Sequence, residues 1–353
     1  MKSLLSTATM KSVRTGAVGK IDVVDVERPV PGPKDALMRI RACGICGTDT
    51  HFLHLGGIPF GPGGSMISLP LGHEPAGEII ELGSDVTGLK VGDRVVVNPQ
   101  SAPSGIIGCG GAHGGMSEYL VIEDAVVGRS VAVLPDTVPY AVAALNEPMA
   151  VARHCVNRSE ADPTDKVVVF GAGPIGLGVT IWLKLRGVQH VTVADVIPER
   201  LDTALAVGAD AVINSATEDI TARLTDLHGP AANALGQPRA GTDIYIDAAG
   251  APAVFDATIA AAKWGAKMVM VAVQKKSDSI DLGGMLRSEL TLIASQGYPT
   301  EIFEVTPDIA EHHERFAKLI SHRVPFTDVQ HAFELALTPG AAEKVVVTFD
   351  DRQ

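Results

Sequence analysis

Two short segments near the start of the chain carry side chains that bind metal ions. Residues 43–51 read CGICGTDTH and residues 72–74 read GHE, which places thiols, imidazoles and carboxylates close together in the sequence. Zinc takes these donors in proteins, and a catalytic zinc uses three protein ligands and leaves a fourth position for water or substrate. The two segments therefore predict a catalytic zinc site.

The Cys43/Cys46 pair has other interpretations. A C-x-x-C redox pair would need a thioredoxin-like strand and helix around it. Half of a four-thiolate zinc site would need a second close pair, which Cys109 and Cys155 do not supply. The two cysteines could also be small buried residues in a turn. On the residues alone these alternatives stay open.

A second pattern predicts a dinucleotide site. Residues 167–176 read VVVFGAGPIG, which places G-x-G-x-x-G directly after an apolar strand and before a helix. The first glycine makes the tight turn, the second lets the backbone approach a pyrophosphate, and the third lets helix and strand pack closely. The pyrophosphate then lies on the helix N-terminus. The predicted cofactor-binding residues of this segment are Gly171, Gly173, Pro174, Ile175 and Gly176.

Two charged residues near the end of the next predicted strand bear on which dinucleotide binds. Asp195 is placed to accept hydrogen bonds from the ribose hydroxyls and to repel a 2′-phosphate, which favours NAD over NADP. Arg200 could flank the adenine or attract a 2′-phosphate. The alternative is that the glycines only shape a turn and that Asp195 is a surface acid.

These residues require two kinds of scaffold. The first 160 residues read as short β runs broken by Gly and Pro, at 37–42, 78–82, 93–97 and 118–122, and predict an irregular β domain. From Lys166 on, six short apolar runs alternate with helical stretches, at 167–170, 190–194, 211–213, 243–246, 267–273 and 290–294. Such runs indicate a parallel sheet buried on both faces, and therefore a doubly wound α/β domain.

The last part of the chain has a different pattern. An amphipathic helix is predicted at 329–337 and a strand at 344–349, too late in the chain for the six-strand sheet. We expect this segment to return to the first domain. The predicted organisation is residues 1–153 as the β domain, 154–294 as the dinucleotide-binding domain and 295–353 as the return segment.

Composition excludes several classes of partner. The 353 residues include 29 Lys and Arg against 41 Asp and Glu, a net charge of −12, which argues against nucleic acid or an anionic membrane surface. No run of about 18 apolar residues occurs, and the first residues are too weakly apolar for a signal peptide, so the cytoplasm is the expected compartment. Four cysteines are too few for a disulfide framework in a chain of this size.

Beyond these patterns, the sequence resembles a known family. Residues 72–86 fit the zinc signature G-H-E-x-x-G-x-x-x-x-x-G-x-x-V of medium-chain alcohol and polyol dehydrogenases, and GICGTDTH fits the family's preceding motif. The resemblance extends to GDRV at 92–95, GMSEY at 115–119, EPMAV at 147–151 and KVVV at 344–347. It implies a GroES-like catalytic domain of irregular β structure and a Rossmann domain with a six-stranded parallel sheet.

The resemblance assigns roles to individual metal ligands. Cys46 aligns with the zinc thiolate, which makes Cys43 a neighbour, and His73 aligns with the imidazole ligand. Glu74 aligns with a carboxylate that binds or lies near the metal. Glu147 lies in a segment like that of the sorbitol, butanediol and threonine dehydrogenase branch, where a glutamate ligates zinc directly or through water.

The resemblance also implies a proton path. Asp49 aligns with the acid that orients the histidine ligand. Thr48 is placed to accept the proton of a zinc-activated alcohol, which passes through the nicotinamide ribose to His51 and then to solvent. The alternative is that His51 is a surface histidine and Thr48 a capping residue. The predicted catalytic residues are Thr48, His51 and Glu74.

The implied activity is hydride transfer between NAD and a secondary alcohol, polyol, vicinal diol or β-hydroxy amino acid. Phe52, Leu55 and residues 296–298 are candidate pocket walls. Tyr298 could hydrogen-bond a second hydroxyl of the substrate or could equally be a packing residue. One competing function is a zinc-free, NADPH-dependent quinone or enoyl reductase, which should lack the G-H-E signature. A non-catalytic relative should have lost its ligand positions.

One departure from the family concerns a second zinc. Most relatives hold a structural zinc with four cysteines in the interval that corresponds to residues 99–115, and here that interval offers only Cys109 and His113. We therefore expect one zinc per chain. In relatives the segment that holds this structural zinc often contributes to subunit contacts, so a homodimer and a homotetramer both stay open.

Overall fold

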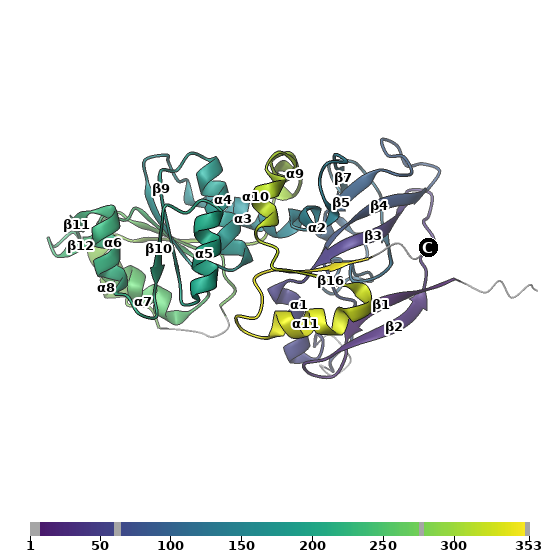
Figure 1. Cartoon of the computed structure of the whole chain (residues 1–353), viewed down its shortest axis with the longest axis horizontal. Helices are drawn as coiled ribbons and strands as arrows, with labels where there is room; N and C mark the ends of the chain where they lie inside the picture. The colour runs from purple at the N-terminus through teal and green to yellow at the C-terminus, as the bar shows by residue number, and fades with distance from the viewer. Residues whose placement is uncertain (1–7, 60–64, 275–278, 350–353) are drawn as a thin grey trace, which may run out of the picture. The chain divides into compact units, whose positions relative to one another are not determined.

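The computed structural model describes residues 8–59, 65–274 and 279–349 (Figure 1). The chain divides into two compact units. The first, called the β unit below, comprises Met1–Glu147 and Thr306–Gln353. The second, called the α/β unit, is Pro148–Val305. The end of the chain thus belongs with its beginning.

The β unit is built on a mostly antiparallel sheet. Among the described residues the strand order is β16-β17-β3-β4-β5-β7, and β6 also pairs with β3. The strands are β3 (Ala36–Gly44), β4 (Glu74–Leu82), β5 (Arg94–Val97), β6 (Tyr119–Ile122), β7 (Val131–Val133), β16 (His322–Pro325) and β17 (Val345–Thr348). The four β runs predicted in this part of the chain fall on β3, β4, β5 and β6. The last strand of the chain, β17, therefore lies inside this sheet, between β16 and β3.

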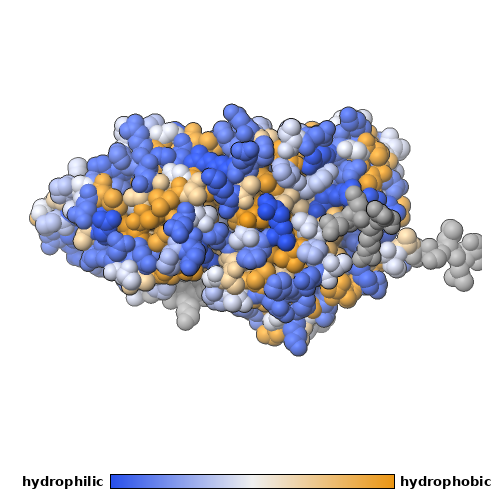
Figure 2. All heavy atoms as spheres, in the orientation of Figure 1, coloured by the Kyte–Doolittle hydropathy of each residue, from blue (hydrophilic) through white to orange (hydrophobic). Residues whose placement is uncertain are grey.

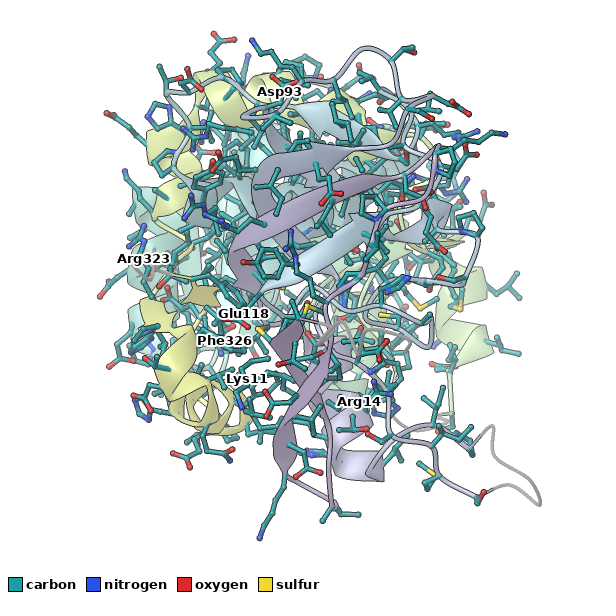
Figure 3. The ribbon with its side chains drawn as sticks, turned by 90° about the vertical axis from the view of Figure 1, so that its right-hand side faces the viewer. Lys11, Arg14, Asp93, Glu118, Arg323 and Phe326 are labelled. Carbon is teal, nitrogen blue, oxygen red and sulfur yellow. The ribbon has the colours of Figure 1, made fainter. Side chains whose placement is uncertain are left out.

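Short helices and a hairpin complete the β unit. The helices are α1 (Gly47–Leu55), α2 (Tyr140–Ala143), α10 (His313–Ala317) and α11 (Val329–Leu337), with 3-10 turns at Pro99–Ser101 and Phe326–Asp328. The predicted helix at 329–337 is confirmed as α11. Strands β1 (Thr9–Thr15) and β2 (Ile21–Glu27) form the hairpin. The hairpin contacts the residue that precedes β6: the backbone N–H of Lys11 donates to the Glu118 carboxylate at 2.7 Å (Figure 3).

The α/β unit contains the predicted parallel sheet. Its order is β10-β9-β8-β13-β14-β15, and every neighbouring pair is parallel. The strands are β8 (Lys166–Phe170), β9 (His190–Asp195), β10 (Ala211–Asn214), β13 (Ile244–Asp247), β14 (Lys267–Met270) and β15 (Thr291–Ala294). Val167, Val168 and Val169 are all fully buried, because helices cover both faces of such a sheet. The six apolar runs and the doubly wound fold are thereby confirmed.

Helices connect these strands. They are α4 (Pro174–Leu185), α5 (Pro198–Ala206), α6 (Ile220–His228), α7 (Pro252–Ala261) and α8 (Leu282–Ser288), while α3 (Asn146–Ser159) and α9 (Glu301–Glu311) cross the unit boundaries. A small hairpin of β11 (Pro230–Ala232) and β12 (Pro238–Ala240) between α6 and β13 was not predicted. Its strands are three residues long and each begins with proline, so neither carries a strand-like run.

The surface is mainly polar on the face shown in Figure 2, where hydrophobic residues form smaller groups between hydrophilic ones. Some large apolar side chains are nevertheless exposed, such as Trp264 and Leu286. None of the helices in the described part of the chain is both long and apolar enough to span a membrane.

Candidate metal and dinucleotide sites

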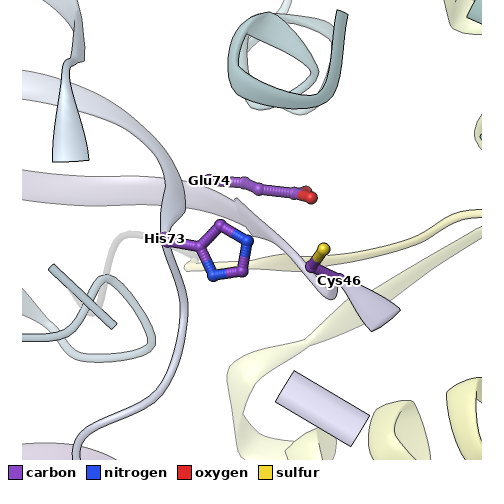
Figure 4. Close-up of side chains that lie close together, drawn as sticks. All are labelled: Cys46, His73 and Glu74. Carbon is purple, nitrogen blue, oxygen red and sulfur yellow. The ribbon is translucent and has the colours of Figure 1, made fainter. Parts of the chain in front are cut away.

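The register of β3 and β4 brings the two predicted metal segments together. Gly44 at the end of β3 pairs with Glu74 at the start of β4. Cys46 lies just beyond β3, as the N-cap of α1, and His73 immediately precedes β4. The donor atoms of Cys46, His73 and Glu74 all lie within 4.8 Å of one another (Figure 4).

This set of donors fits a zinc ion. Zinc bonds to sulfur, nitrogen and oxygen are 2.0–2.3 Å long, so neighbouring ligand atoms around a tetrahedral ion lie about 3.3–3.8 Å apart. Donor atoms within 4.8 Å of one another can close on an ion with side-chain movements of about an ångström. A thiolate, an imidazole and a carboxylate also leave a fourth position open, as a catalytic zinc requires.

Asp49 fixes the backbone of both metal segments. It is buried on α1, where its carboxylate accepts hydrogen bonds from the backbone N–H of Cys46 at 2.9 Å and of Gly72 at 3.1 Å. Burial raises the pKa of Asp49, whereas the His73 ring and the two backbone donors act in the opposite direction. Its Oδ1 atom lies 3.8 Å from His73 Nδ1, beyond hydrogen-bond distance.

The two cysteines of the C-x-x-C pair have different surroundings. Cys43 is fully buried in the apolar core of the β unit, and burial raises the pKa of its thiol far above the ordinary value. It packs against Gly72, where a Cβ would lie 2.9 Å from its sulfur. Cys46 is partly exposed and belongs to the donor cluster.

Lys344 is a component of the site that sequence patterns did not indicate. Its ammonium group is buried and lies 2.7 Å from Glu74 Oε1, 2.5 Å from Glu74 Oε2 and 3.0 Å from the Ile45 carbonyl oxygen. Burial lowers the pKa of Lys344, but the charges of Glu74, Cys46 and Glu147 outweigh burial, so the net shift is upward. The only sequence signal is a lysine that directly precedes a buried apolar strand.

The Glu74–Lys344 ion pair lies against Gly44. A Cβ on Gly44 would lie 1.9 Å from Glu74 Oε2 and 3.0 Å from Lys344 Cε. Only glycine therefore leaves room for the carboxylate at this point. Glu74 therefore belongs both to the ion pair with Lys344 and to the donor cluster.

Glu147 lies outside the cluster of three donors. It is the second residue of α3, is partly exposed, and acts on the site through its charge on Lys344. The structure thus brings together three of the four predicted metal ligands, and whether Glu147 ligates the metal stays a prediction.

The two residues of the predicted proton path lie on α1, next to the metal cluster. The Thr48 hydroxyl oxygen is 3.7 Å from Cys46 Sγ, and the Thr48 side chain is partly buried. His51 lies three residues further along the same helix and is exposed. One helical turn therefore leads from the cluster to solvent.

The candidate pocket walls differ in burial. Phe52 is packed partly against the core of the β unit, and Leu55 at the end of α1 is exposed. Tyr298 is buried in the α/β unit.

The glycine-rich turn after β8 has the geometry of a dinucleotide site. Gly171 has a φ of +95°, and a Cβ on Gly176 would lie 1.8 Å from the Gly171 carbonyl oxygen. Around Gly173 a Cβ would meet no atom within 4 Å, so the backbone there borders open space. Gly173 is also the N-cap of α4, which has Pro174 at its first position and no side-chain cap. The free N–H groups of this helix end fit the negative charge of a pyrophosphate.

Asp195 ends β9 beside this turn. It is buried, and its carboxylate accepts hydrogen bonds from the backbone N–H of Ala172 at 2.6 Å and of Ile197 at 2.9 Å. Arg200 is partly buried on α5. Asp195 therefore also holds the glycine-rich turn in place, in addition to its predicted contact with ribose.

A doubly wound unit with this turn, and a β unit with a thiolate, an imidazole and a carboxylate at one point, define a zinc-dependent dehydrogenase. Comparisons with known families agree. Residues 32–135 match the alcohol dehydrogenase GroES-like domain and residues 174–311 match the zinc-binding dehydrogenase family. The chain belongs to the zinc-dependent medium-chain dehydrogenases and is an oxidoreductase that acts on CH–OH groups.

Individual relatives cover nearly the whole chain. (R,R)-Butanediol dehydrogenase from Bacillus subtilis (strain 168) is 30% identical over 358 residues, which span 96% of this chain and 99% of the relative. The crystal structure of 2R,3R-butanediol dehydrogenase from Bacillus subtilis has a TM-score of 0.82 at 28% identity and covers 96% of this chain and 99% of its own. A zinc-binding dehydrogenase from Sinorhizobium meliloti 1021 bound to NADP has a TM-score of 0.80 at 28% identity, covering 97% and 99%.

Proposed function

We propose that this protein is a zinc- and NAD-dependent dehydrogenase of secondary alcohols that carry a neighbouring oxygen, such as vicinal diols, polyols or β-hydroxy amino acids. The observation that carries the proposal is the convergence of Cys46, His73 and Glu74 within 4.8 Å, beside a buried lysine. A zinc-free quinone or enoyl reductase would have no use for such a cluster. The similarity to butanediol dehydrogenase supports a diol among the candidate substrates.

The protein's own residues would hold the metal and move the proton. Cys46 and His73 would ligate zinc, with Glu74 or Glu147 as the third ligand. Zinc bound there would supply a Lewis acid that makes an alcohol easier to deprotonate. The Thr48 hydroxyl would accept the alcohol proton, and His51 would release it to solvent, which its exposure permits.

The preference for NAD rests on Asp195. A buried carboxylate at the end of β9 repels the 2′-phosphate of NADP and can still accept a ribose hydroxyl through lone pairs not used by Ala172 and Ile197. Arg200 on the following helix is the residue that could reverse this preference.

A substrate panel tests the proposal. Initial rates would be measured at the NADH absorbance band for simple secondary alcohols, vicinal diols, polyols and β-hydroxy amino acids, each with NAD and with NADP. We expect the highest kcat/KM with NAD and a substrate that carries a second oxygen. Faster turnover with NADP would overturn the interpretation of Asp195, and equal rates with simple alcohols would overturn the substrate class.

Zinc stoichiometry and assembly are further parts of the proposal. We propose one zinc per chain and a cytoplasmic homodimer or homotetramer. Metal analysis of the purified protein should find one tightly bound zinc per chain, and two would contradict the expectation. Sedimentation analysis would give the oligomeric state.

A further inference from the structure

Residues 99–115 correspond to the segment that holds a structural zinc in most relatives, and here they pack against His73. Ile107 is buried in the core of the β unit, and its backbone N–H donates to the Pro99 carbonyl at 3.0 Å. The next residue, Gly108, has a φ of +68° and passes so close to Gly72 that a Cβ would lie 2.2 Å from the Gly72 carbonyl oxygen. This close passage places Cys109 beside His73.

The thiol of Cys109 contacts the ring nitrogen of His73 that faces away from the metal cluster. Cys109 Sγ lies 3.3 Å from His73 Nδ1, within hydrogen-bond distance for sulfur. The other ring nitrogen faces Cys46 and Glu74 (Figure 4). If His73 ligates zinc through that second nitrogen, Nδ1 must carry the proton, and Cys109 is placed to accept its hydrogen bond.

The carboxylate expected to orient His73 is engaged elsewhere. Asp49 accepts from the backbone N–H of Cys46 and of Gly72, and its distance to His73 Nδ1 is 3.8 Å. The sulfur of Cys109 is therefore closer to Nδ1 than the Asp49 carboxylate.

We propose that Cys109 is a positioning residue that holds the His73 imidazole in the orientation and tautomer needed to bind zinc. This inference rests on the zinc site of the proposed function. A thiol in this position gives the segment at residues 99–115 a role at the catalytic metal, although it lacks the cysteines for a structural zinc. Partners of metal-bound histidines contribute about 10- to 100-fold to metal affinity.

The test compares three single variants of the full-length protein. Cys109→Ala removes the acceptor, Cys109→Ser keeps a smaller one, and Cys155→Ala removes a buried thiol in the α/β unit as a matched control. The affinity for zinc would be measured by competition with a chromophoric chelator, and the metal geometry by the visible spectrum of the Co²⁺-substituted protein. Neither readout depends on activity.

We expect Cys109→Ala to weaken zinc binding about tenfold and to shift the Co²⁺ spectrum, with Cys109→Ser between it and wild type. Cys155→Ala should bind zinc as wild type does. If Cys109→Ala left zinc affinity and spectrum unchanged, or weakened binding no more than Cys155→Ala, the proposal would fail. A wild-type protein that bound no zinc would instead overturn the proposed function, so the two failures are distinguishable.

Discussion

The two sites of this protein are built in different ways. The dinucleotide site is a contiguous turn of backbone, in which Gly173 borders open space while Gly171 and Gly176 let backbone segments pack closely. The metal site is made of side chains from three separate segments, at residues 46, 73–74 and 344, and strand pairing brings them together: β3 with β4, and β17 with β3. A backbone site depends on local geometry, whereas a side-chain site depends on the whole sheet and on the charges buried within it.

The largest effect is expected from replacement of Cys46, the predicted zinc thiolate. Cys46→Ser should abolish zinc binding and reduce kcat/KM by more than about 100-fold, because loss of a ligand exceeds the loss of an outer partner. Cys43→Ser should retain most activity and lower stability, because Cys43 packs in the core. Metal analysis and steady-state kinetics would check both. Equal behaviour of the two variants would contradict the assignment.

The next effect concerns the buried ion pair. Lys344→Met leaves Glu74 buried without its partner, so the free energy of unfolding of the metal-free protein should fall by about 3–5 kcal/mol. The double variant with Glu74→Gln should recover part of this loss, since the uncompensated charge is gone.

An exposed ion pair in the same unit is the control for that measurement. In the pair Lys11–Asp25, 42% and 62% of the side-chain surfaces are exposed, so Lys11→Met should change the free energy of unfolding by less than about 1 kcal/mol. Urea denaturation measures both variants. Similar losses in Lys344→Met and Lys11→Met would show that burial of the Glu74 carboxylate carries no penalty.

A buried histidine of the α/β unit, His228, is neutral, in contrast to the ion pair of the β unit. His228 lies between the hydroxyls of Thr192 and Thr242, at 3.0 and 2.8 Å, and burial together with the charge of Lys166 lowers its pKa to about 4. The unfolded chain, with a histidine pKa near 6.5, binds more protons between these values. The contribution of His228 to the free energy of unfolding should therefore fall by at most about 3 kcal/mol as the pH drops from above 6.5 to 4. Below pH 4 this contribution should change no further.

The measurement for His228 is a difference between proteins, because carboxylates titrate in the same range. Urea unfolding at several pH values would be compared for wild type and His228→Gln. The variant should show a flatter dependence between pH 6.5 and 4. Parallel curves would mean that the pKa of His228 is the same in the folded and the unfolded chain.

The contrast between a site made of backbone and a site made of side chains explains what could be predicted from the sequence. The six-strand sheet and the glycine-rich turn were predictable, because burial on both faces and positive φ each leave a signal in consecutive residues. The donor chemistry of residues 43–51 and 72–74 predicted a zinc site, and the family resemblance selected Cys46, His73 and Glu74 as candidate ligands. Lys344 and Cys109 could not be given their roles, because each meets the site through contacts that only the folded sheet and the 99–115 segment create.

The smallest effects are expected in the glycine-rich turn, where Gly173 borders open space and Gly176 is closely packed. Gly173→Ala should leave stability within about 0.5 kcal/mol of wild type, since the new Cβ meets no atom and φ is −77°. It should weaken NADH binding about tenfold, or about 1.4 kcal/mol, because the methyl group occupies the space proposed for the pyrophosphate.

Gly176→Ala should instead destabilise the fold by about 1–3 kcal/mol, because its Cβ would overlap the Gly171 carbonyl oxygen. Fluorescence titration with NADH and urea unfolding distinguish the two variants. Normal NADH affinity in Gly173→Ala would mean that the cofactor's pyrophosphate does not approach this glycine. Binding of the dinucleotide would then depend on side chains, as binding of the metal does.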